Sequence, residues 1–125
     1  MPAPITAAYA AVLAILVIAL GINVTMHRVK LQVPLGDGGN AQMVRLHGNA
    51  AEYIPLAVAL MLIYEVNGGL HIVLNAAGIA LIVGRLLQTW GMWSTERPGF
   101  GRGAGQTLTW LAIATLAVFN LLQFA

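Results

Sequence analysis

The chain has 125 residues, of which 59% are hydrophobic and only 8% are charged, and its formal net charge is +2. Soluble domains carry roughly 25% charged residues, and a water-soluble fold of this length could not hide so much apolar surface. Six Lys/Arg residues are too few for a surface that tracks phosphates, so nucleic acid is not expected as a partner. The absence of cysteine excludes disulfides and a cysteine nucleophile. The composition therefore predicts an integral membrane protein with a single domain over residues 1–125.

The first predicted helix spans residues 5–26, a stretch without charge that is long enough to cross the hydrocarbon at about 1.5 Å per residue. No basic segment precedes it, so we interpret it as a retained helix rather than a secretory signal. His27, Arg28 and Lys30 close this helix. A turn-rich linker over residues 35–40 then leads to the next apolar stretch.

Three further apolar stretches predict helices over residues 41–64, 70–93 and 106–124. Glu65 and a glycine pair end the second of them, and the glycine-rich residues 94–105 are expected to form the third loop. The predicted fold class is therefore all-α, an integral membrane four-helix bundle.

The distribution of basic residues predicts the orientation of the bundle. The loops after the first and third helices share one side of the membrane and hold Arg28, Lys30, Arg97 and Arg102. The loop after the second helix offers only Glu65. By the positive-inside rule, the first and third loops are cytoplasmic and both termini lie outside.

A polar stripe interrupts the second apolar stretch. Arg45, Asn49 and Glu52 stand four and three residues apart, so at about 100° per residue they share one helix face. His47 points away from this stripe, and three histidines at unrelated positions do not form a metal site. The stripe occupies the cytoplasmic half of its helix.

Further polar side chains are expected around the same recess, from the end of the third helix and the start of the fourth: Arg85, Gln88 and Arg102. An ionised group within the bilayer is costly, so Glu52 and Arg85 are expected to pair, and that pair alone could be structural. Arg45 and Arg102 have no acidic partner. A cationic recess with one carboxylate suits an anionic ligand that bears carboxylates and an ammonium group.

Three sequence stretches resemble a known family: GDGGN at residues 36–40, RLHGNAAEYIP at residues 45–55 and VGRLL at residues 83–87. They are similar to the bacterial branch of the membrane-associated proteins in eicosanoid and glutathione metabolism, the MAPEG family. The family includes microsomal glutathione S-transferases and microsomal prostaglandin E synthase. The resemblance covers nearly the whole chain, and the Arg-x-His-x-Asn-x-x-Glu stretch is its most specific element.

The resemblance implies a homotrimer of four-helix protomers in a bacterial inner membrane. Glutathione would be the co-substrate, bound between neighbouring subunits near the cytoplasmic side, and the second substrate would be lipophilic. Arg102 would stabilise the glutathione thiolate, and Arg85 would brace Glu52. The residues that this interpretation assigns to substrate binding are Arg45, Asn49, Glu52, Arg85 and Gln88.

The sequence also departs from the family. Gly48 replaces a second arginine of the eicosanoid enzymes, and Gln88 stands where some members have histidine. Met92 and Gln106 lie near positions where those enzymes have tyrosine. These departures disfavour eicosanoid synthesis.

The leading hypothesis is thus a glutathione-dependent transferase or peroxidase that acts on lipophilic electrophiles. The alternative is a non-catalytic trimeric membrane protein whose polar stripe binds a lipid headgroup or another anion, or only specifies assembly. A small transporter or channel is a weaker interpretation, because the first and fourth helices offer almost no polar face to line a path.

Overall fold

Four helices make up the computed structural model, which describes residues 2–32, 41–94 and 100–123. They are α1 (Pro4–Leu31), α2 (Ala41–Val66), α3 (His71–Ser94) and α4 (Phe100–Leu122), and no strand occurs within those ranges. Each helix contains a segment long and apolar enough to cross a membrane, which confirms the predicted all-α class with four candidate spans. The predicted linker over residues 35–40 and most of the third loop lie outside the described residues.

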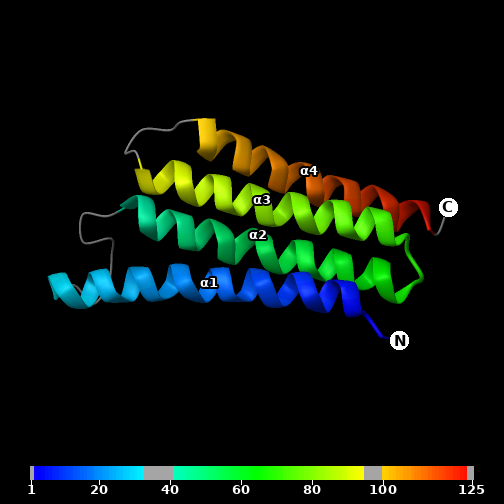
Figure 1. The fold of residues 1–125 in the computed structure, drawn as a ribbon, viewed down its shortest axis with the longest axis horizontal. Helices are drawn as coiled ribbons and strands as arrows, with labels where there is room; N and C mark the ends of the chain where they lie inside the picture. The colour runs from blue at the N-terminus through cyan, green and yellow to red at the C-terminus, as the bar shows by residue number, and fades with distance from the viewer. Residues whose placement is uncertain (1, 33–40, 95–99, 124–125) are drawn as a thin grey trace.

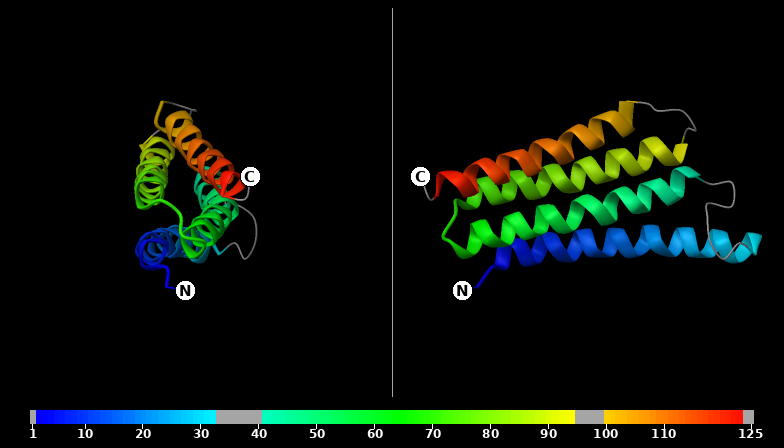
Figure 2. Two further views of the ribbon diagram at one scale, coloured as in Figure 1. Left: turned by 90° about the vertical axis from the view of Figure 1, so that its right-hand side faces the viewer. Right: turned by 180° about the vertical axis from the view of Figure 1, so that it is seen from behind.

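The helices run up and down, so both termini lie at one end of the bundle and the α1–α2 and α3–α4 connections lie at the other (Figure 1). The view along the bundle in Figure 2 shows α3 beside α4 and α1 beside α2. The closest packing is between α3 and α4, while α2 contacts all three other helices. We call the end with the two connections the loop end, and the opposite end the terminal end.

The outer surface of the bundle is apolar, unlike that of a soluble protein, although most of the buried core is apolar as well. Large apolar side chains face outward on every helix, with Ile72 75% exposed and Leu121 74% exposed. Several polar side chains face inward instead, including Arg85, Gln88 and Thr109. In hydrocarbon no water is available to satisfy polar groups, so they must find partners inside the bundle.

Helix α1 is longer than the stretch predicted to end at residue 26, because it continues through His27, Arg28 and Lys30 to Leu31. Its 28 residues extend about 42 Å at 1.5 Å per residue, whereas the hydrocarbon layer is about 30 Å thick. Charged side chains do not stop a helix that has left the hydrocarbon, because they are hydrated there. Figure 1 shows this end of α1 extending beyond the start of α2.

The glycine-rich segment is part of α4, which begins at Phe100, so the prediction of a loop up to residue 105 was wrong. Gly101 and Gly105 face α3 closely. A Cβ atom at Gly101 would lie 2.8 Å from a backbone oxygen of α3, and one at Gly84 would lie 2.9 Å from the carbonyl oxygen of Gly105. Small residues four apart let membrane helices approach closely, so these glycines serve helix packing rather than a turn.

At the terminal end, the carboxylate of Glu65 caps α1. Its Oε1 accepts a hydrogen bond from the backbone N–H of Thr6 at 2.7 Å, and its Oε2 accepts one from Ile5 at 3.1 Å. The first N–H groups of a helix have no partner within the helix, and a carboxylate there is also favoured by the helix dipole. Glu65, expected in the loop after the second helix, lies instead in the last turn of α2 and is 9% exposed.

Candidate functional site

Near the loop end, two adjoining hollows form one cleft between α2, α3 and α4, which we call the polar cleft. One hollow, of about 380 Å³, is lined by Arg45, Gly48, Asn49, Glu52, Gln88 and Arg102. The other, of about 510 Å³, is lined by Asn49, Tyr53, Gln88, Arg102, Gly103, Gln106, Thr107 and Trp110. Both volumes fall within the roughly 300–1,000 Å³ of small-molecule sites. The structure thus brings together five of the six residues expected around a recess.

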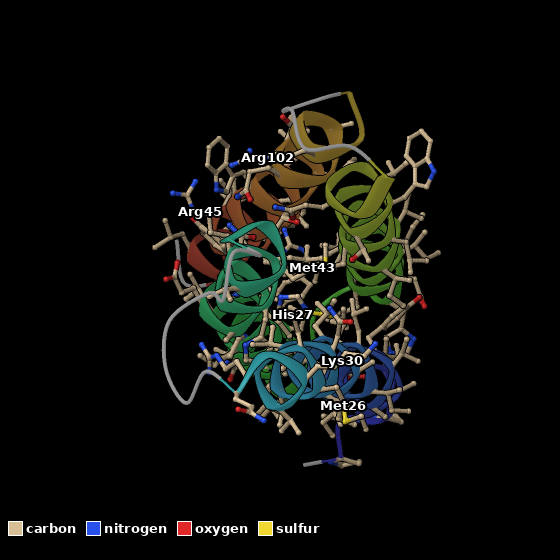
Figure 3. The ribbon with its side chains drawn as sticks, turned by 90° about the vertical axis from the view of Figure 1, so that its left-hand side faces the viewer. Met26, His27, Lys30, Met43, Arg45 and Arg102 are labelled. Carbon is tan, nitrogen blue, oxygen red and sulfur yellow. The ribbon has the colours of Figure 1, made fainter. Side chains whose placement is uncertain are left out.

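Helix α2 supplies one wall of the polar cleft through the predicted stripe. Arg45 and Glu52 are exposed, and Asn49 between them is half-buried. Figure 3 looks onto the loop end and shows Arg45 of α2 and Arg102 of α4 on the same side of the bundle. Among the residues whose positions are described, neither guanidinium has a hydrogen bond or an ion pair, so their charge is available to a ligand in the cleft.

Arg85, the sixth predicted residue, lies behind the wall of the polar cleft rather than in it. It is 1% exposed. Its Nη1 donates to Asn49 Oδ1 at 2.7 Å, and its Nη2 donates to Thr109 Oγ1 at 3.1 Å and to Gln88 Oε1. Three helices therefore converge on one guanidinium, which fixes the positions of two side chains that line the cleft.

The predicted pair between Glu52 and Arg85 is not found in the described part of the chain. Glu52 is exposed on the open side of the cleft, whereas neutral oxygens surround Arg85. The physical reason is depth: Asn49 lies one turn nearer the loop end on α2 and faces inward, so its amide reaches the guanidinium. Arg85 consequently keeps an uncompensated positive charge behind the cleft.

Gln106 is a residue of the cleft that the sequence analysis did not include among the binding residues. Gln88 Nε2 donates to Gln106 Oε1 at 3.3 Å and to Asn49 Oδ1 at 3.4 Å. Gln106 follows Arg102 by four residues and therefore lies on the same face of α4. The four-residue spacing from Arg102 could have identified Gln106 as a residue of the cleft. However, the fourth helix was predicted to begin at residue 106, so Arg102 was assigned to a loop and no helical spacing applied to it.

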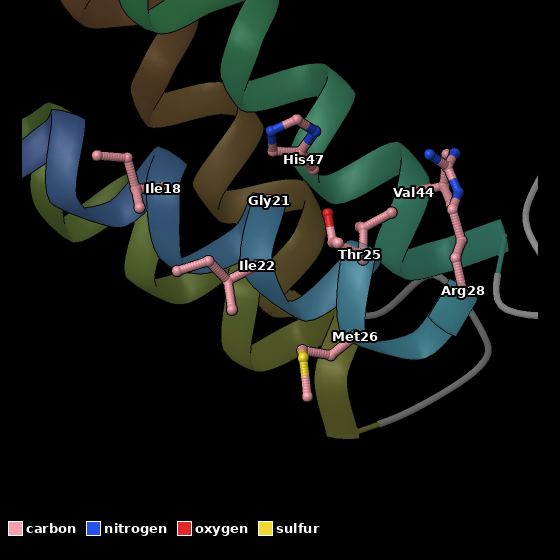
Figure 4. Close-up of a pocket in the computed structure, with 9 residues that line it drawn as sticks. Ile18, Gly21, Ile22, Thr25, Met26, Arg28, Val44 and His47 are labelled. Atoms are coloured by element: carbon pink, nitrogen blue, oxygen red, sulfur yellow. The ribbon is translucent and has the colours of Figure 1, made fainter. Parts of the chain in front are cut away.

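A separate hollow, of about 560 Å³, lies between α1 and α2 (Figure 4). It is mostly apolar, with Arg28, Thr25 and His47 as its polar lining. His47 turns toward Gly21 of α1, and a Cβ atom at Gly21 would lie 3.1 Å from the imidazole Nε2. His47 thus faces away from the polar cleft, as its spacing from the stripe predicted.

Four antiparallel helices of membrane length, with a buried arginine behind a cationic cleft at one end, define a small polytopic membrane protein. The sequence profile of the MAPEG family matches residues 6–122. The match covers nearly all of the chain, and it agrees with the resemblance carried by the Arg-x-His-x-Asn-x-x-Glu stretch. The chain therefore belongs to the MAPEG family.

Two curated relatives are similar to this chain over most of their length. They are the inner membrane protein YecN of Escherichia coli strain K12 and the protein of the same name from Escherichia coli O6:H1 strain CFT073. Each is 36% identical over 120 residues, which make up 94% of this chain and 90% of the relative. No solved structure matches the chain.

Proposed function

We propose that this protein is a glutathione-dependent transferase or peroxidase that acts on lipophilic electrophiles in a bacterial inner membrane. The observation that carries the proposal is the polar cleft: Arg45 and Arg102 line it and form no ion pair among the described residues, and the buried Arg85 adds positive charge behind it. Glutathione bears two carboxylates and one ammonium group. The carboxylates match the guanidinium groups of the cleft, and the ammonium group matches the carboxylate of Glu52.

Arg102 has the position required for a catalytic residue. A fixed guanidinium lowers the pKa of a neighbouring thiol and so raises the fraction of reactive thiolate. Arg102 belongs to the first turn of α4 and lines both hollows of the cleft. In a transferase, the thiolate sulfur forms a bond to the electrophilic carbon while the leaving group departs with its bonding pair. Arg45, Asn49, Glu52 and Gln88 hold the peptide.

Assembly as a homotrimer completes this site. The polar cleft is open on its outer side, and the separate hollow between α1 and α2 presents Arg28 and His47 amid apolar side chains (Figure 4). Glutathione lies between two neighbouring subunits, with the polar cleft of one subunit facing the α1–α2 surface of the next. The enclosed site excludes water and so strengthens every charge interaction in it.

The loop end is cytoplasmic and both termini lie outside. This orientation is supported by the basic side chains of the described residues at the loop end, which include Arg28 and Lys30 in the last turn of α1 and also Arg45 and Arg102 (Figure 3). Basic residues accumulate on the cytoplasmic side of membrane proteins. Glutathione would then enter from the cytoplasm and the electrophile from the bilayer.

The alternative function is non-catalytic binding of an anionic lipid headgroup in the same cleft. It is favoured by the exposure of Arg45 near the loop end, at the level where headgroups lie. The two functions differ in their ligand: a headgroup needs only the cations, whereas glutathione also uses Glu52 and supplies a thiol.

The proposal is tested with matched alanine variants of the two arginines that line the cleft, in purified protein. Arg102→Ala should leave glutathione affinity, measured by calorimetry, nearly unchanged while lowering thiolate absorbance and reducing the conjugation rate by roughly 10²-fold. Arg45→Ala should weaken glutathione binding by about tenfold, or 1.4 kcal/mol, because its contact with a carboxylate is present before and during reaction.

Two results would overturn this assignment. Wild-type protein that gives no binding heat with glutathione, but retains anionic lipid in native mass spectrometry, would favour the headgroup function. Thiolate absorbance and turnover unchanged in Arg102→Ala would remove the catalytic role of that residue, even with glutathione bound.

A further inference from the structure

A chain of oriented amides leads from the buried arginine to the polar cleft. The guanidinium of Arg85 has only donors, so any amide that contacts it must present oxygen. Gln88 does so through Oε1, which turns its Nε2 toward α4. There, Gln106 Oε1 accepts a hydrogen bond from Gln88 Nε2 at 3.3 Å. One buried cation therefore fixes the orientation of two successive amides.

The last amide in this series, that of Gln106, has a donor without an acceptor among the described residues. Oε1 of Gln106 is occupied by the bond from Gln88, so the donor Nε2 of the same amide takes no part in that contact. That nitrogen is buried, and within the described ranges it has no hydrogen-bond partner. A buried N–H without an acceptor is unfavourable, and an acceptor brought by a ligand would relieve the cost.

The position of Gln106 indicates which ligand would supply the acceptor. Gln106 lines the polar cleft together with Arg102, Thr107 and Trp110. It follows Arg102 by one turn of α4, about 6 Å further from the loop end along the helix. A neutral amide donor at that depth, beside the ring of Trp110, suits an uncharged oxygen that arrives from the hydrocarbon. The charged groups of glutathione bind more favourably to Arg45 and Arg102, which lie nearer the loop end.

We propose that the electrophile of this site is a lipophilic α,β-unsaturated ketone or aldehyde, whose carbonyl oxygen accepts a hydrogen bond from Gln106. The inference depends on the proposed glutathione function. In the reaction, the thiolate sulfur bonds to the β-carbon and the C=C electron pair moves to form an enolate, whose oxygen carries the negative charge. The α-carbon then takes a proton from water. Gln106 stabilises the enolate oxygen, and Arg85 and Gln88 are positioning residues.

The first test compares two electrophiles in Gln106→Met, a substitution that keeps the shape of the side chain and removes its donor. With a long-chain unsaturated ketone and saturating glutathione, kcat/KM should fall by roughly 10²-fold, the usual cost of losing one oxyanion donor. With benzyl bromide, which has no oxygen acceptor, it should change by less than about twofold. Gln123→Met makes the same substitution beyond the opposite end of α4, where that side chain contacts Asn67, and should alter neither rate.

A spectroscopic measurement separates donation from a merely structural role. A saturated ketone of the same length cannot react, so its carbonyl stretching frequency can be recorded in the glutathione complex. The frequency should be lower in the wild-type protein than in hydrocarbon solvent, because a donor contacts the oxygen. The shift should disappear in Gln106→Met and persist in Gln123→Met.

The positioning role is tested with Gln88→Glu. A carboxylate still accepts from Arg85 but has no N–H to hold Gln106 Oε1, so the amide of Gln106 is released. At saturating glutathione, the ratio of the rate with the unsaturated ketone to the rate with benzyl bromide should fall by about tenfold, less than for loss of the donor itself. The ratio removes any effect of Gln88→Glu on glutathione that both reactions share.

The outcomes distinguish failure of the glutathione function from failure of the carbonyl contact alone. A wild-type protein that binds no glutathione and conjugates neither electrophile would refute the proposed function and this inference with it. A wild-type protein that conjugates both, with Gln106→Met lowering both rates equally or neither, would refute the carbonyl assignment alone. An unshifted carbonyl frequency in wild-type protein would do the same.

Discussion

At the terminal end of the bundle, Glu65 is a buried charge with short contacts to two backbone N–H groups of α1. At the loop end, Arg85 is a buried charge of opposite sign whose described partners are neutral side-chain oxygens. The first arrangement joins α1 to α2 and leaves no ligand role for the carboxylate. The second leaves a positive field beside a cleft that also holds Arg45 and Arg102.

The two arrangements give a buried charge two different roles within a membrane bundle. A carboxylate at a helix N-terminus is compensated by the positive end of that helix, so its role is structural. A guanidinium held by amides and a hydroxyl is hydrogen-bonded but not neutralised. Such a group adds positive potential to its surroundings, and it also orients the amides of Asn49 and Gln88 that line the cleft.

Removing the charge at the loop end should give the largest effect on stability. Arg85→Met leaves the oxygens of Gln88 and Thr109 without their donor from Arg85, and Asn49 Oδ1 keeps only its 3.4 Å bond from Gln88 Nε2, at about 1–3 kcal/mol for each buried group left unpaired. The expected loss is roughly 3 kcal/mol or more, measured as thermal unfolding in detergent. Arg102→Met is the matched control, because Arg102 makes no such contacts, and its unfolding temperature should stay near that of the wild type. Equal losses in both variants would contradict the amide network.

Removing the charge at the terminal end should have the next largest effect. Glu65→Ala deprives the first turn of α1 of two hydrogen bonds to a charged acceptor, worth about 2–3 kcal/mol together. Glutathione affinity should be unchanged, because the polar cleft lies at the other end. Glu52→Ala removes an exposed glutamate from the same helix and should affect binding rather than unfolding temperature. The comparison fails if Glu65→Ala weakens glutathione binding as much as Glu52→Ala does.

The smallest of the three effects is expected at the packed surface that holds the cleft together. Gly105→Ala places a Cβ atom against the backbone of α3, including 2.7 Å from the amide nitrogen of Gln88, and overpacking of this kind costs about 1–3 kcal/mol. Gly103→Ala, two positions earlier on the same helix, meets nothing within 4 Å and should be neutral or slightly stabilising. Unfolding measurements of the pair decide the point, and similar losses from both would mean that α3 and α4 are not closely packed.

The four spans and the polar stripe could be predicted because both are local patterns. Long uncharged runs define spans by length alone, and the 3.6-residue period places Arg45, Asn49 and Glu52 on one face. The partners of Arg85 could be predicted only in part. Gln88 follows it by three residues and is therefore a local partner, but Thr109 comes from another helix and carries no pattern that identifies it.

Two other features, the packing glycines of α4 and the cap formed by Glu65, could not be predicted. The first depends on a residue type with two common roles, and the second on a contact between residues far apart in the sequence. Glycine permits both a turn and close helix packing, and only the position of α3 shows which applies to Gly101 and Gly105. Glu65 contacts residues about sixty positions earlier, and neither end of that contact carries a local capping signal. Its position after an apolar run is what a loop residue would also have.

Arg85 also bears on how the chain enters the membrane during synthesis. An arginine near the centre of a spanning helix raises the free energy of insertion by about 2.5–3.5 kcal/mol, and by less toward the helix ends. Asn49, on α2, has already been synthesised when α3 emerges, but Thr109 and the glycines of α4 come later. We therefore expect α3 to be the span least able to insert alone, so that the α3–α4 hairpin, rather than the single helix, is the unit that leaves the translocon.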